Sequence, residues 1–131
     1  MNKKILLKGA LLGCIAVIFG ALGAHALKQV LTNDQLLSFE TAVRYQIYHA
    51  IVLLFLAIGA KWFNDKTLKL SSLFIFWGVI LFSGSIYLLT IKNIFELSFL
   101  KFAGPITPLG GIFLIIGWVI IIKEALSKKT S

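Results

Sequence analysis

The chain is short and strongly apolar, which excludes most soluble architectures. It has 131 residues, of which 59% are hydrophobic and 14% are charged. Soluble domains carry about 25% charged residues, and a chain of this length cannot enclose so much apolar surface in a core of its own. The formal net charge of +8 does not indicate nucleic-acid binding, because the basic residues are spread over loops and ends instead of forming one patch. We therefore predict a single transmembrane domain over residues 1–131. We expect it to contact membrane lipids and not to bind nucleic acid.

Four long apolar segments account for most of the chain. A helix needs about 20 apolar residues to cross a bilayer, so these segments predict an all-α fold, an integral membrane four-helix bundle. The second segment is the shortest, and it reaches full length only if Arg44 lies among the headgroups, where its long side chain can reach water. The expected spans cover about residues 9–27, 41–60, 70–91 and 104–122.

The basic residues are distributed unequally between the two sides that four spans would create. Nine lie at the ends of the chain and in the second loop, and four lie in the first and third loops. Cytoplasmic loops carry the excess of lysine and arginine in membrane proteins. The sequence therefore predicts a multi-pass protein of the bacterial inner (plasma) membrane with both termini in the cytoplasm.

Small residues form a stripe along the first expected span. They fall within a narrow arc of the helical wheel at 100° per residue, and such a stripe lets a second backbone approach closely. The stripe predicts a packing seam, either within the bundle or between the subunits of a homo-oligomer. Cys14, the single cysteine, lies in the same span and permits no internal disulfide. The stripe consists of Gly9, Gly13, Ala16, Gly20, Gly23 and Ala24.

Two later segments carry the signatures of helix starts. Thr32 is followed three residues later by Gln35, as in a capping box, so a helix is expected from about residue 33 to residue 60. Before the fourth span, Thr107 is the predicted N-cap and Pro108 the first helical residue.

The second expected helix carries most of the polar side chains. Glu40 and Arg44 are spaced to form an ion pair, which would reduce the cost of placing charges in a membrane. The simplest interpretation is that this pair and two tyrosines anchor the helix at the outer interface. One ladder comprises Glu40, Arg44 and Tyr48, a second comprises Thr41, Tyr45 and His49, and Gln46 points away from both.

With both termini inside, the polar groups of all four spans fall in the outer half of the bilayer, and the inner half is predicted to be almost purely apolar. An ionisable group inside a membrane normally faces protein or water. We therefore hypothesise one shared polar cluster, or a shallow binding pocket, that faces outward. Its members are His25, Glu40, Arg44, Tyr45, Gln46, Tyr48, His49, Ser83, Ser85, Tyr87 and Thr107.

The two histidines allow two interpretations. His25 and His49 could ligate haem iron or serve a haem- or quinone-linked redox component. The simpler role is hydrogen bonding across helices, as polar residues do in membrane bundles. A structural zinc site usually has four ligands, so we expect no metal site and no cofactor.

Four motifs, in order along the chain, carry a resemblance to a known family. They are GALGAHAL at residues 20–27, TAVRYQIYHA at 41–50, FSGSIYL at 82–88 and GPITPLGG at 104–111. Over residues 9–118 the chain resembles the YgdD/YwdK-type small bacterial membrane proteins, domain-of-unknown-function family four-two-three, which is related to a small eukaryotic transmembrane protein. The resemblance implies a four-helix integral membrane protein, and it implies no activity, substrate or cofactor.

No catalytic motif accompanies these features. The sequence has no phosphate-binding loop, no nucleophile elbow and no pair of carboxylates inside a span. We therefore expect a structural or envelope-maintenance protein of the membrane and no enzyme. A small transporter, a channel or a lipid-binding module is the main alternative, and the histidine-based redox component is the other.

Overall fold

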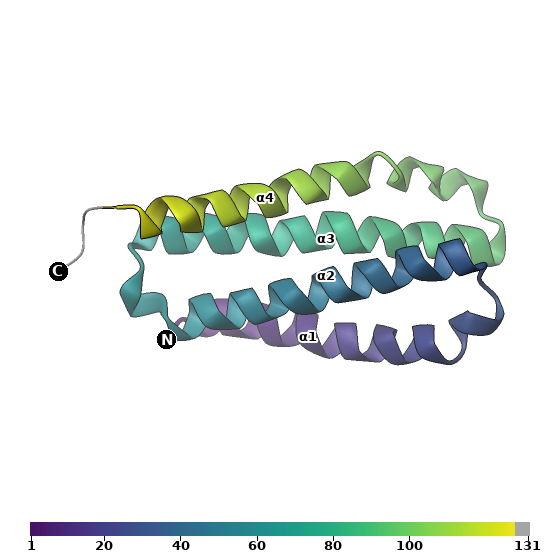
Figure 1. Cartoon of the computed structure of the whole chain (residues 1–131), viewed down its shortest axis with the longest axis horizontal. Coiled ribbons are helices and arrows are strands. Elements are labelled where there is room, and N and C mark those ends of the chain that lie inside the picture. The colour runs from purple at the N-terminus through teal and green to yellow at the C-terminus, as the bar shows by residue number, and fades with distance from the viewer. Residues whose placement is uncertain (128–131) are drawn as a thin grey trace.

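A computed structural model of the chain describes residues 1–127, and over this range the chain forms four long helices joined by short connections (Figure 1). Each helix is long and apolar enough to cross a membrane. The predicted all-α membrane fold is therefore confirmed, while the exact limits of each span within its helix stay predictions. The helices are α1 (Lys3–Ala24), α2 (Asn33–Ile58), α3 (Asp65–Phe95) and α4 (Ile106–Ala125).

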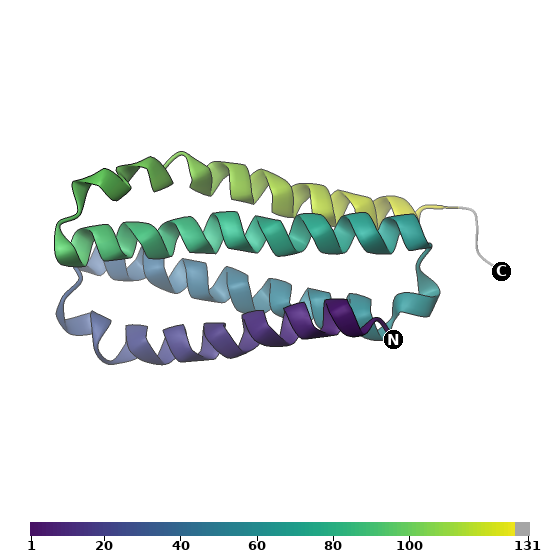
Figure 2. The same ribbon diagram turned by 180° about the vertical axis from the view of Figure 1, so that it is seen from behind.

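The helices run up and down, so the chain starts and finishes at the same end of the molecule. α1 begins and α4 ends at this end, which also holds the connection between α2 and α3 (Figures 1 and 2). We call it the terminal end, and the opposite end the loop end. The connections contain three short 3₁₀ helices: η1 (Leu27–Gln29) and η3 (Ser98–Ala103) at the loop end, and η2 (Ala60–Trp62) at the terminal end.

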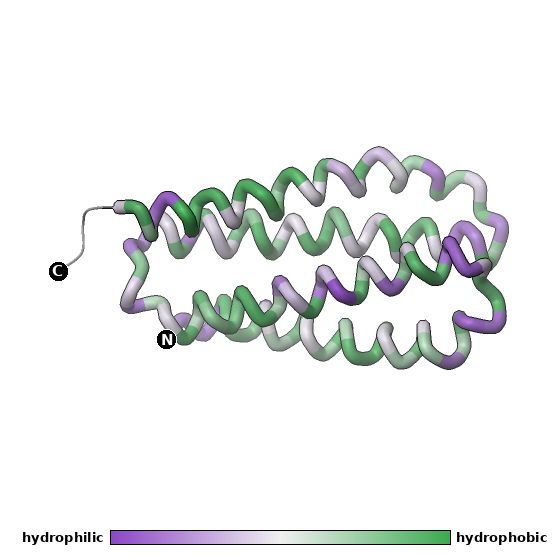
Figure 3. The backbone as a smooth tube through the Cα atoms, viewed as in Figure 1, coloured by the Kyte–Doolittle hydropathy of each residue, from purple (hydrophilic) through white to green (hydrophobic). Residues whose placement is uncertain are grey.

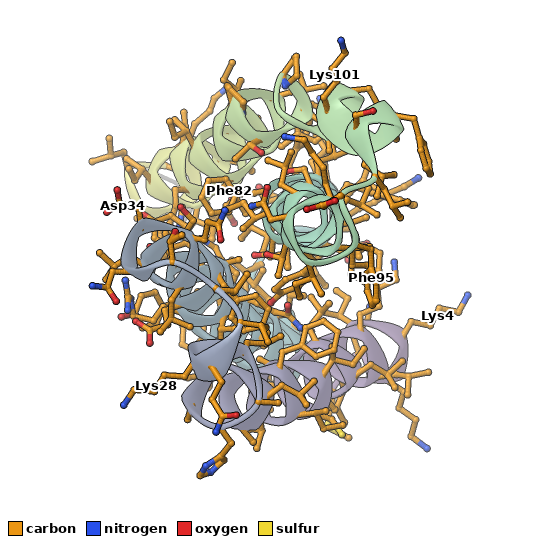
Figure 4. All side chains as sticks on the ribbon, turned by 90° about the vertical axis from the view of Figure 1, so that its right-hand side faces the viewer. Lys4, Lys28, Asp34, Phe82, Phe95 and Lys101 are labelled. Carbon is orange, nitrogen blue, oxygen red and sulfur yellow. The ribbon has the colours of Figure 1, made fainter. Side chains whose placement is uncertain are left out.

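The two middle helices of the sequence are also the two inner helices of the fold. α1 packs mainly against α2, α4 packs mainly against α3, and α2 and α3 pack against each other. Viewed from the loop end, α1 and α4 therefore lie on opposite sides of the molecule (Figure 4). The largest fully buried apolar side chains are Leu53, Leu56, Ile75 and Val79, all on α2 and α3. The outer helices expose wide apolar surfaces, which a bilayer covers with lipid.

The start of α2 follows the sequence prediction. The Thr32 hydroxyl accepts from the Gln35 amide at 3.2 Å, and the Gln35 side chain accepts from the Thr32 amide at 3.1 Å. These two bonds satisfy amides that have no partner inside the helix. The predicted capping box is therefore confirmed, and α2 ends at Ile58, two residues before the expected limit.

The start of α4 differs from the prediction that Thr107 is the N-cap. The helix begins at Ile106, and Pro105 is the N-cap with φ −66° and ψ −18°. Pro108 consequently lies in the first turn, where the amide it lacks would have had no helical partner. The Thr107 hydroxyl is directed across to α3 instead of capping its own helix, and it contacts Ser85.

The stripe of small residues on α1 packs inside the chain. A Cβ added at Gly9 would lie 3.0 Å from the Ala50 carbonyl oxygen, and one at Gly23 would lie 2.9 Å from the Phe39 ring. Both partners are on α2. Ala24, the last member of the stripe, is exposed. The seam predicted from the sequence is therefore an α1–α2 contact.

A second glycine seam joins α3 and α4 even more closely. A Cβ added at Gly110 would lie 2.2 Å from the Phe82 backbone nitrogen, and one at Gly117 would lie 2.6 Å from the Ile75 side chain. The Gly110 contact involves backbone on the α3 side, so no rotamer change can relieve it. Glycine thus fixes the closest approach of these two helices.

Candidate functional site

Gln46 is the centre of a deeply buried polar contact. The side chain is 2% exposed, and it lies between three helices. Its Nε2 donates to the Leu12 carbonyl oxygen of α1 at 2.8 Å, and its Oε1 accepts from the Tyr87 hydroxyl of α3 at 2.6 Å. One amide of α2 therefore links this helix to α1 through an N–H and to α3 through its carbonyl oxygen.

Aromatic rings surround the Tyr87 side of this contact. The Phe19 ring meets the Tyr87 ring edge to face, with centroids 4.7 Å apart, and Phe39 lies 5.5 Å from Tyr87. Edge-to-face packing is a favourable arrangement of aromatic rings. The rings hold the Tyr87 hydroxyl where Gln46 can accept from it, so the polar and aromatic contacts support each other.

Two serines of α3 connect this helix to its neighbours on either side. The Ser83 hydroxyl donates to the Ala42 carbonyl oxygen of α2 at 2.7 Å. The Ser85 hydroxyl lies within hydrogen-bonding distance of the Phe82 carbonyl and of the Thr107 hydroxyl of α4. Both serines are buried, and both hydroxyls are engaged in contacts that position helices.

His49 connects α2 with α4. Its Nδ1 is 2.7 Å from the Tyr45 carbonyl oxygen, and its Nε2 is 3.0 Å from the indole Nε1 of Trp118. A carbonyl oxygen and an indole N–H allow one assignment: the neutral ring carries its proton on Nδ1 and accepts from the indole at Nε2. Both ring nitrogens are therefore used.

Trp118 was not among the residues predicted from the sequence. A tryptophan inside a span needs a partner for its N–H, and a histidine inside a span needs partners for both nitrogens. These two requirements could have suggested a hydrogen bond between a tryptophan and a histidine, but they do not identify which tryptophan lies beside which histidine. The pairing depends on how α4 sits against α2, which one-dimensional spacing does not show.

A groove lies between α2 and α4 beside this contact. It has a volume of about 650 Å³, and its wall is mostly apolar and aromatic. The Tyr45 ring stacks on the Phe82 ring with centroids 4.8 Å apart, which forms one side of the groove. The lining residues are Tyr45, Tyr48, His49, Phe82, Gly111, Leu114, Ile115 and Trp118.

The predicted ion pair between Glu40 and Arg44 is not formed. Arg44 is exposed, and its Nη2 donates to the Thr41 hydroxyl at 3.2 Å. Within residues 1–127, Arg44 and Glu40 make no ion pair within 4.0 Å. The i, i+4 spacing permits the ion pair. The exposed guanidinium instead donates to the Thr41 hydroxyl on the same face of the helix, and an exposed ion pair would add little stability.

The two histidines are far apart. His25 is the exposed C-cap residue of α1 at the loop end. His49 lies 16 residues beyond the first residue of α2, or about 24 Å along the helix axis. The structure therefore does not bring them together to bind one iron, and both nitrogens of His49 already have partners.

The eleven candidate residues consequently divide among separate contacts instead of sharing one pocket. Gln46 pairs with Tyr87, Ser85 with Thr107, and Ser83 with the α2 backbone. Tyr45, Tyr48 and His49 line the α2–α4 groove. His25, Glu40 and Arg44 join none of these groups. Neighbouring positions on α2 are directed at three different partners, α1, α3 and α4, because α2 is an inner helix.

Polar groups also occur in the terminal-end half of the molecule. The Glu124 carboxylate of α4 accepts from the Asn64 backbone and side-chain amides and, at 2.9 Å, from the Thr67 hydroxyl. Ser71 and Ser72 are buried in the same half and donate to carbonyls of their own helix. Figure 3 shows hydrophilic residues at both ends and along the loop-end half of α2, while the terminal-end part of α2 is hydrophobic. Asn64, Thr67 and Glu124 lie outside the expected spans, so the predicted difference between the two halves of the bilayer stays a prediction.

Comparison with known proteins identifies a family of membrane proteins. The family model described as Protein of unknown function (DUF423) matches residues 19–111. A UPF0382 membrane protein of Staphylococcus aureus is 38% identical over 92% of this chain and 93% of its own length. The UPF0382 membrane protein YwdK of Bacillus subtilis is 36% identical over 94% of this chain and 96% of its own length.

A further relative carries the location in its name. The UPF0382 inner membrane protein YgdD of Escherichia coli K12 is 32% identical over 98% of this chain and 93% of its own length. No solved structure gives a significant match. The four membrane-length helices and these relatives place the protein in the inner membrane as a multi-pass protein. The chain belongs to the DUF423 family, also named UPF0382, as its sequence motifs indicated.

Proposed function

We propose that this protein has a structural role in the inner membrane, in maintenance of the cell envelope, and that it is not an enzyme. One observation carries the proposal: the polar side chains buried among the helices are engaged with other helices or with backbone. Within residues 1–127, no buried side-chain nitrogen or oxygen lacks a hydrogen-bond partner. A catalytic group needs an atom that is available to substrate, whereas these groups hold helices together.

Complementation of a strain that lacks the gene tests this role. If the role is structural, rescue under envelope stress should follow the amount of folded protein in the membrane. Tyr48→Phe and Arg44→Gln change exposed side chains and should rescue fully. Gln46→Leu breaks an interhelical contact and should rescue only in proportion to its membrane level. A variant at wild-type level that fails to rescue would instead reveal a specific site.

The proposed orientation places both termini in the cytoplasm. Seven lysines lie at the terminal end within the described residues, and four basic residues belong to the loop-end half; Lys128 and Lys129 lie outside the described residues. The difference supports a cytoplasmic terminal end by the positive-inside rule. Fusion of a periplasm-active phosphatase after residue 127 should give an inactive reporter, and fusion within η3 should give an active one. The reverse pattern would overturn the orientation.

A second candidate function is binding of a lipid-soluble molecule in the α2–α4 groove. Its apolar and aromatic lining and its volume of about 650 Å³ favour an acyl or isoprenoid chain over a polar solute. Gly111→Leu should fill this groove, since a Cβ there meets only the Phe82 ring edge at 3.9 Å. Gly84→Leu is the matched control, because nothing lies within 4 Å of its Cβ.

Mass spectrometry of lipids that copurify with each variant provides the readout. We expect Gly111→Leu to lose a bound species that the wild type and Gly84→Leu retain, at equal melting temperatures. Identical lipid profiles in all three proteins would remove this candidate. Self-association stays a prediction, and the glycine stripe of α1 does not support it because that stripe is used inside the chain.

A further inference from the structure

The terminal end holds a groove between α1 and α3 that takes no part in the contacts described above. These two helices make few direct contacts, so their first turns leave a space of about 490 Å³. In Figure 4, Lys4 projects on the α1–α3 side of the molecule, opposite the side of Asp34 on α2. The groove is lined by Asn2, Lys4, Ile5, Lys8, Asp65, Leu68, Lys69, Ser72 and Leu73.

The groove has an excess of positive charge. Lys4 and Lys8 lie one turn apart on α1, and Lys69 faces them from α3, while Asp65 is the single carboxylate in the lining. Within residues 1–127, none of the three lysines lies within 4.0 Å of a carboxylate. The groove therefore presents three cations and one anion, with no ion pair formed among them.

Lys8 is the lysine of the groove whose charge is partly removed from water, which costs free energy. It is half-buried, and its ammonium lies over the Phe76 ring, 4.9 Å from the centroid. A cation–π contact offsets part of the cost of removing an ammonium from water. A cation at the edge of a membrane is better satisfied by an anion, and no carboxylate of the described chain reaches it.

The walls of the groove indicate what kind of anion would fit. Ile5, Leu68 and Leu73 line it beside the lysines, and the exposed apolar faces of α1 and α3 continue from it toward the middle of the bundle. A free inorganic anion would contact only the ammonium groups. A molecule with an anionic headgroup and an apolar tail would contact both parts of the groove.

We propose that the α1–α3 groove binds an anionic phospholipid. The phosphate lies between the ammonium groups of Lys4, Lys8 and Lys69, and an acyl chain packs along Ile5, Leu68 and Leu73. Basic pockets between transmembrane helices are sites of this kind of recognition, because they combine headgroup charge with acyl-chain contact. The site is independent of the structural role proposed above and of the groove between α2 and α4.

The same end of the molecule offers a matched control. A groove of similar size between α3 and α4 contains Lys66 and Lys123. Its carboxylate, Glu124, is fixed in the groove by Asn64 and Thr67. This second groove has a smaller charge excess and its carboxylate would repel a phosphate. Loss of its lysines should therefore leave phospholipid binding at the α1–α3 groove unchanged.

The test measures the melting temperature of the purified full chain in detergent micelles as lipid is added. Phosphatidylglycerol should raise the melting temperature, and phosphatidylcholine with the same acyl chains should raise it less. Lys8→Gln or Lys69→Gln should each raise the half-saturating phosphatidylglycerol fraction about fivefold. The triple variant Lys4→Gln, Lys8→Gln, Lys69→Gln should raise it more than about tenfold. The double variant Lys66→Gln, Lys123→Gln should match the wild type.

Each remaining outcome counts against the proposal. Equal stabilisation by the two lipids would show that headgroup charge is not recognised. Equal losses in the triple variant and in the double control would show a general effect of lysine. Inorganic phosphate that reproduces the full shift would identify an anion site without lipid. If the triple variant melts early without lipid, the two single variants decide the question, and unchanged half-saturation in both would overturn the site.

Discussion

The two outer helices approach the inner pair to different degrees. At the α3–α4 contact, glycine lies directly against backbone, so that a Cβ at Gly110 would be 2.2 Å from the Phe82 nitrogen. At the α1–α2 contact, added Cβ atoms would be mostly 2.9–3.9 Å from their neighbours. There the buried Gln46 amide adds a bond to the α1 backbone. Both contacts also carry hydrogen bonds, from Thr67 to Glu124 and between Ser85 and Thr107 at α3–α4, and from Gln46 to Leu12 at α1–α2. They differ in how closely glycine brings the two backbones together.

This difference determines which substitutions separate each outer helix from the inner pair. In a membrane, water does not drive apolar surfaces together, so close packing and interhelical hydrogen bonds must hold the helices. A contact made by glycine fails when volume is added. A contact made by an amide fails when the polar group is removed. The same kind of substitution should therefore have unequal effects on the two sides of the molecule.

The largest effect is expected for Gly110→Ala. The new Cβ would overlap the α3 backbone, which cannot rotate away, so α4 must move. We expect a loss of about 3 kcal/mol in the free energy of unfolding, at the upper end of the usual cost of overpacking, measured by titration of micellar protein with a denaturing detergent. Gly84→Ala is the control and should be neutral or stabilising by about 0.5–1 kcal/mol, because it meets nothing and removes a helix glycine. Equal stability of the two variants would contradict the close contact.

A smaller effect is expected for Gln46→Leu. It removes the bonds to the Leu12 carbonyl and the Tyr87 hydroxyl. The hydroxyl loses its partner, whereas the Leu12 carbonyl, inside α1, keeps its helical bond. The expected loss is about 1–2 kcal/mol, with unfolding starting at α1. A double-mutant cycle with Tyr87→Phe should give a coupling energy above about 0.5 kcal/mol. Strict additivity of the two substitutions would show that the bond contributes nothing.

Trp118→Phe should weaken the attachment of α4 to α2. Phenylalanine keeps the aromatic surface but has no N–H to donate to the His49 Nε2, 3.0 Å away. We expect a loss of about 0.5–1.5 kcal/mol. Trp77→Phe is the matched control, since Trp77 is exposed and makes no hydrogen bond within the described chain. If both substitutions cost the same, the indole N–H does not stabilise the fold.

The smallest effect is expected for Arg44→Ala. An ion pair with Glu40 would have made Arg44 important, but the exposed guanidinium contacts only the Thr41 hydroxyl. Surface contacts of this kind contribute about 0–1 kcal/mol, so the change in unfolding free energy should stay within about 0.5 kcal/mol. A loss comparable to that of Gln46→Leu would mean that Arg44 binds a group in the membrane that holds the helix.

The sequence alone predicted the membrane class, the number of helices and the capping box at Thr32. These features depend on local patterns: long apolar runs, and a hydroxyl and an amide three residues apart. The N-cap of α4 was predicted wrongly at Thr107, because a nearby 3₁₀ segment leads into the helix earlier and Ser85 offers the Thr107 hydroxyl a partner from another helix. Local patterns could not include that partner.

The candidate site shows the same limit. Composition and spacing identified Gln46, His49 and Ser83 as polar residues inside spans that need partners. They could not give the partners, because Leu12, Ala42 and Trp118 lie 34, 41 and 69 residues away along the chain. What the sequence by itself determined was that four apolar helices must cross a membrane and that their polar groups must be satisfied there. Only the tertiary structure decided that α2 and α3 are the inner helices and that the polar groups of α2 face three different helices. It also decided that the first turns of α1 and α3 stay apart at a lysine-lined groove. These outcomes depend on which helix faces approach closely enough to pack.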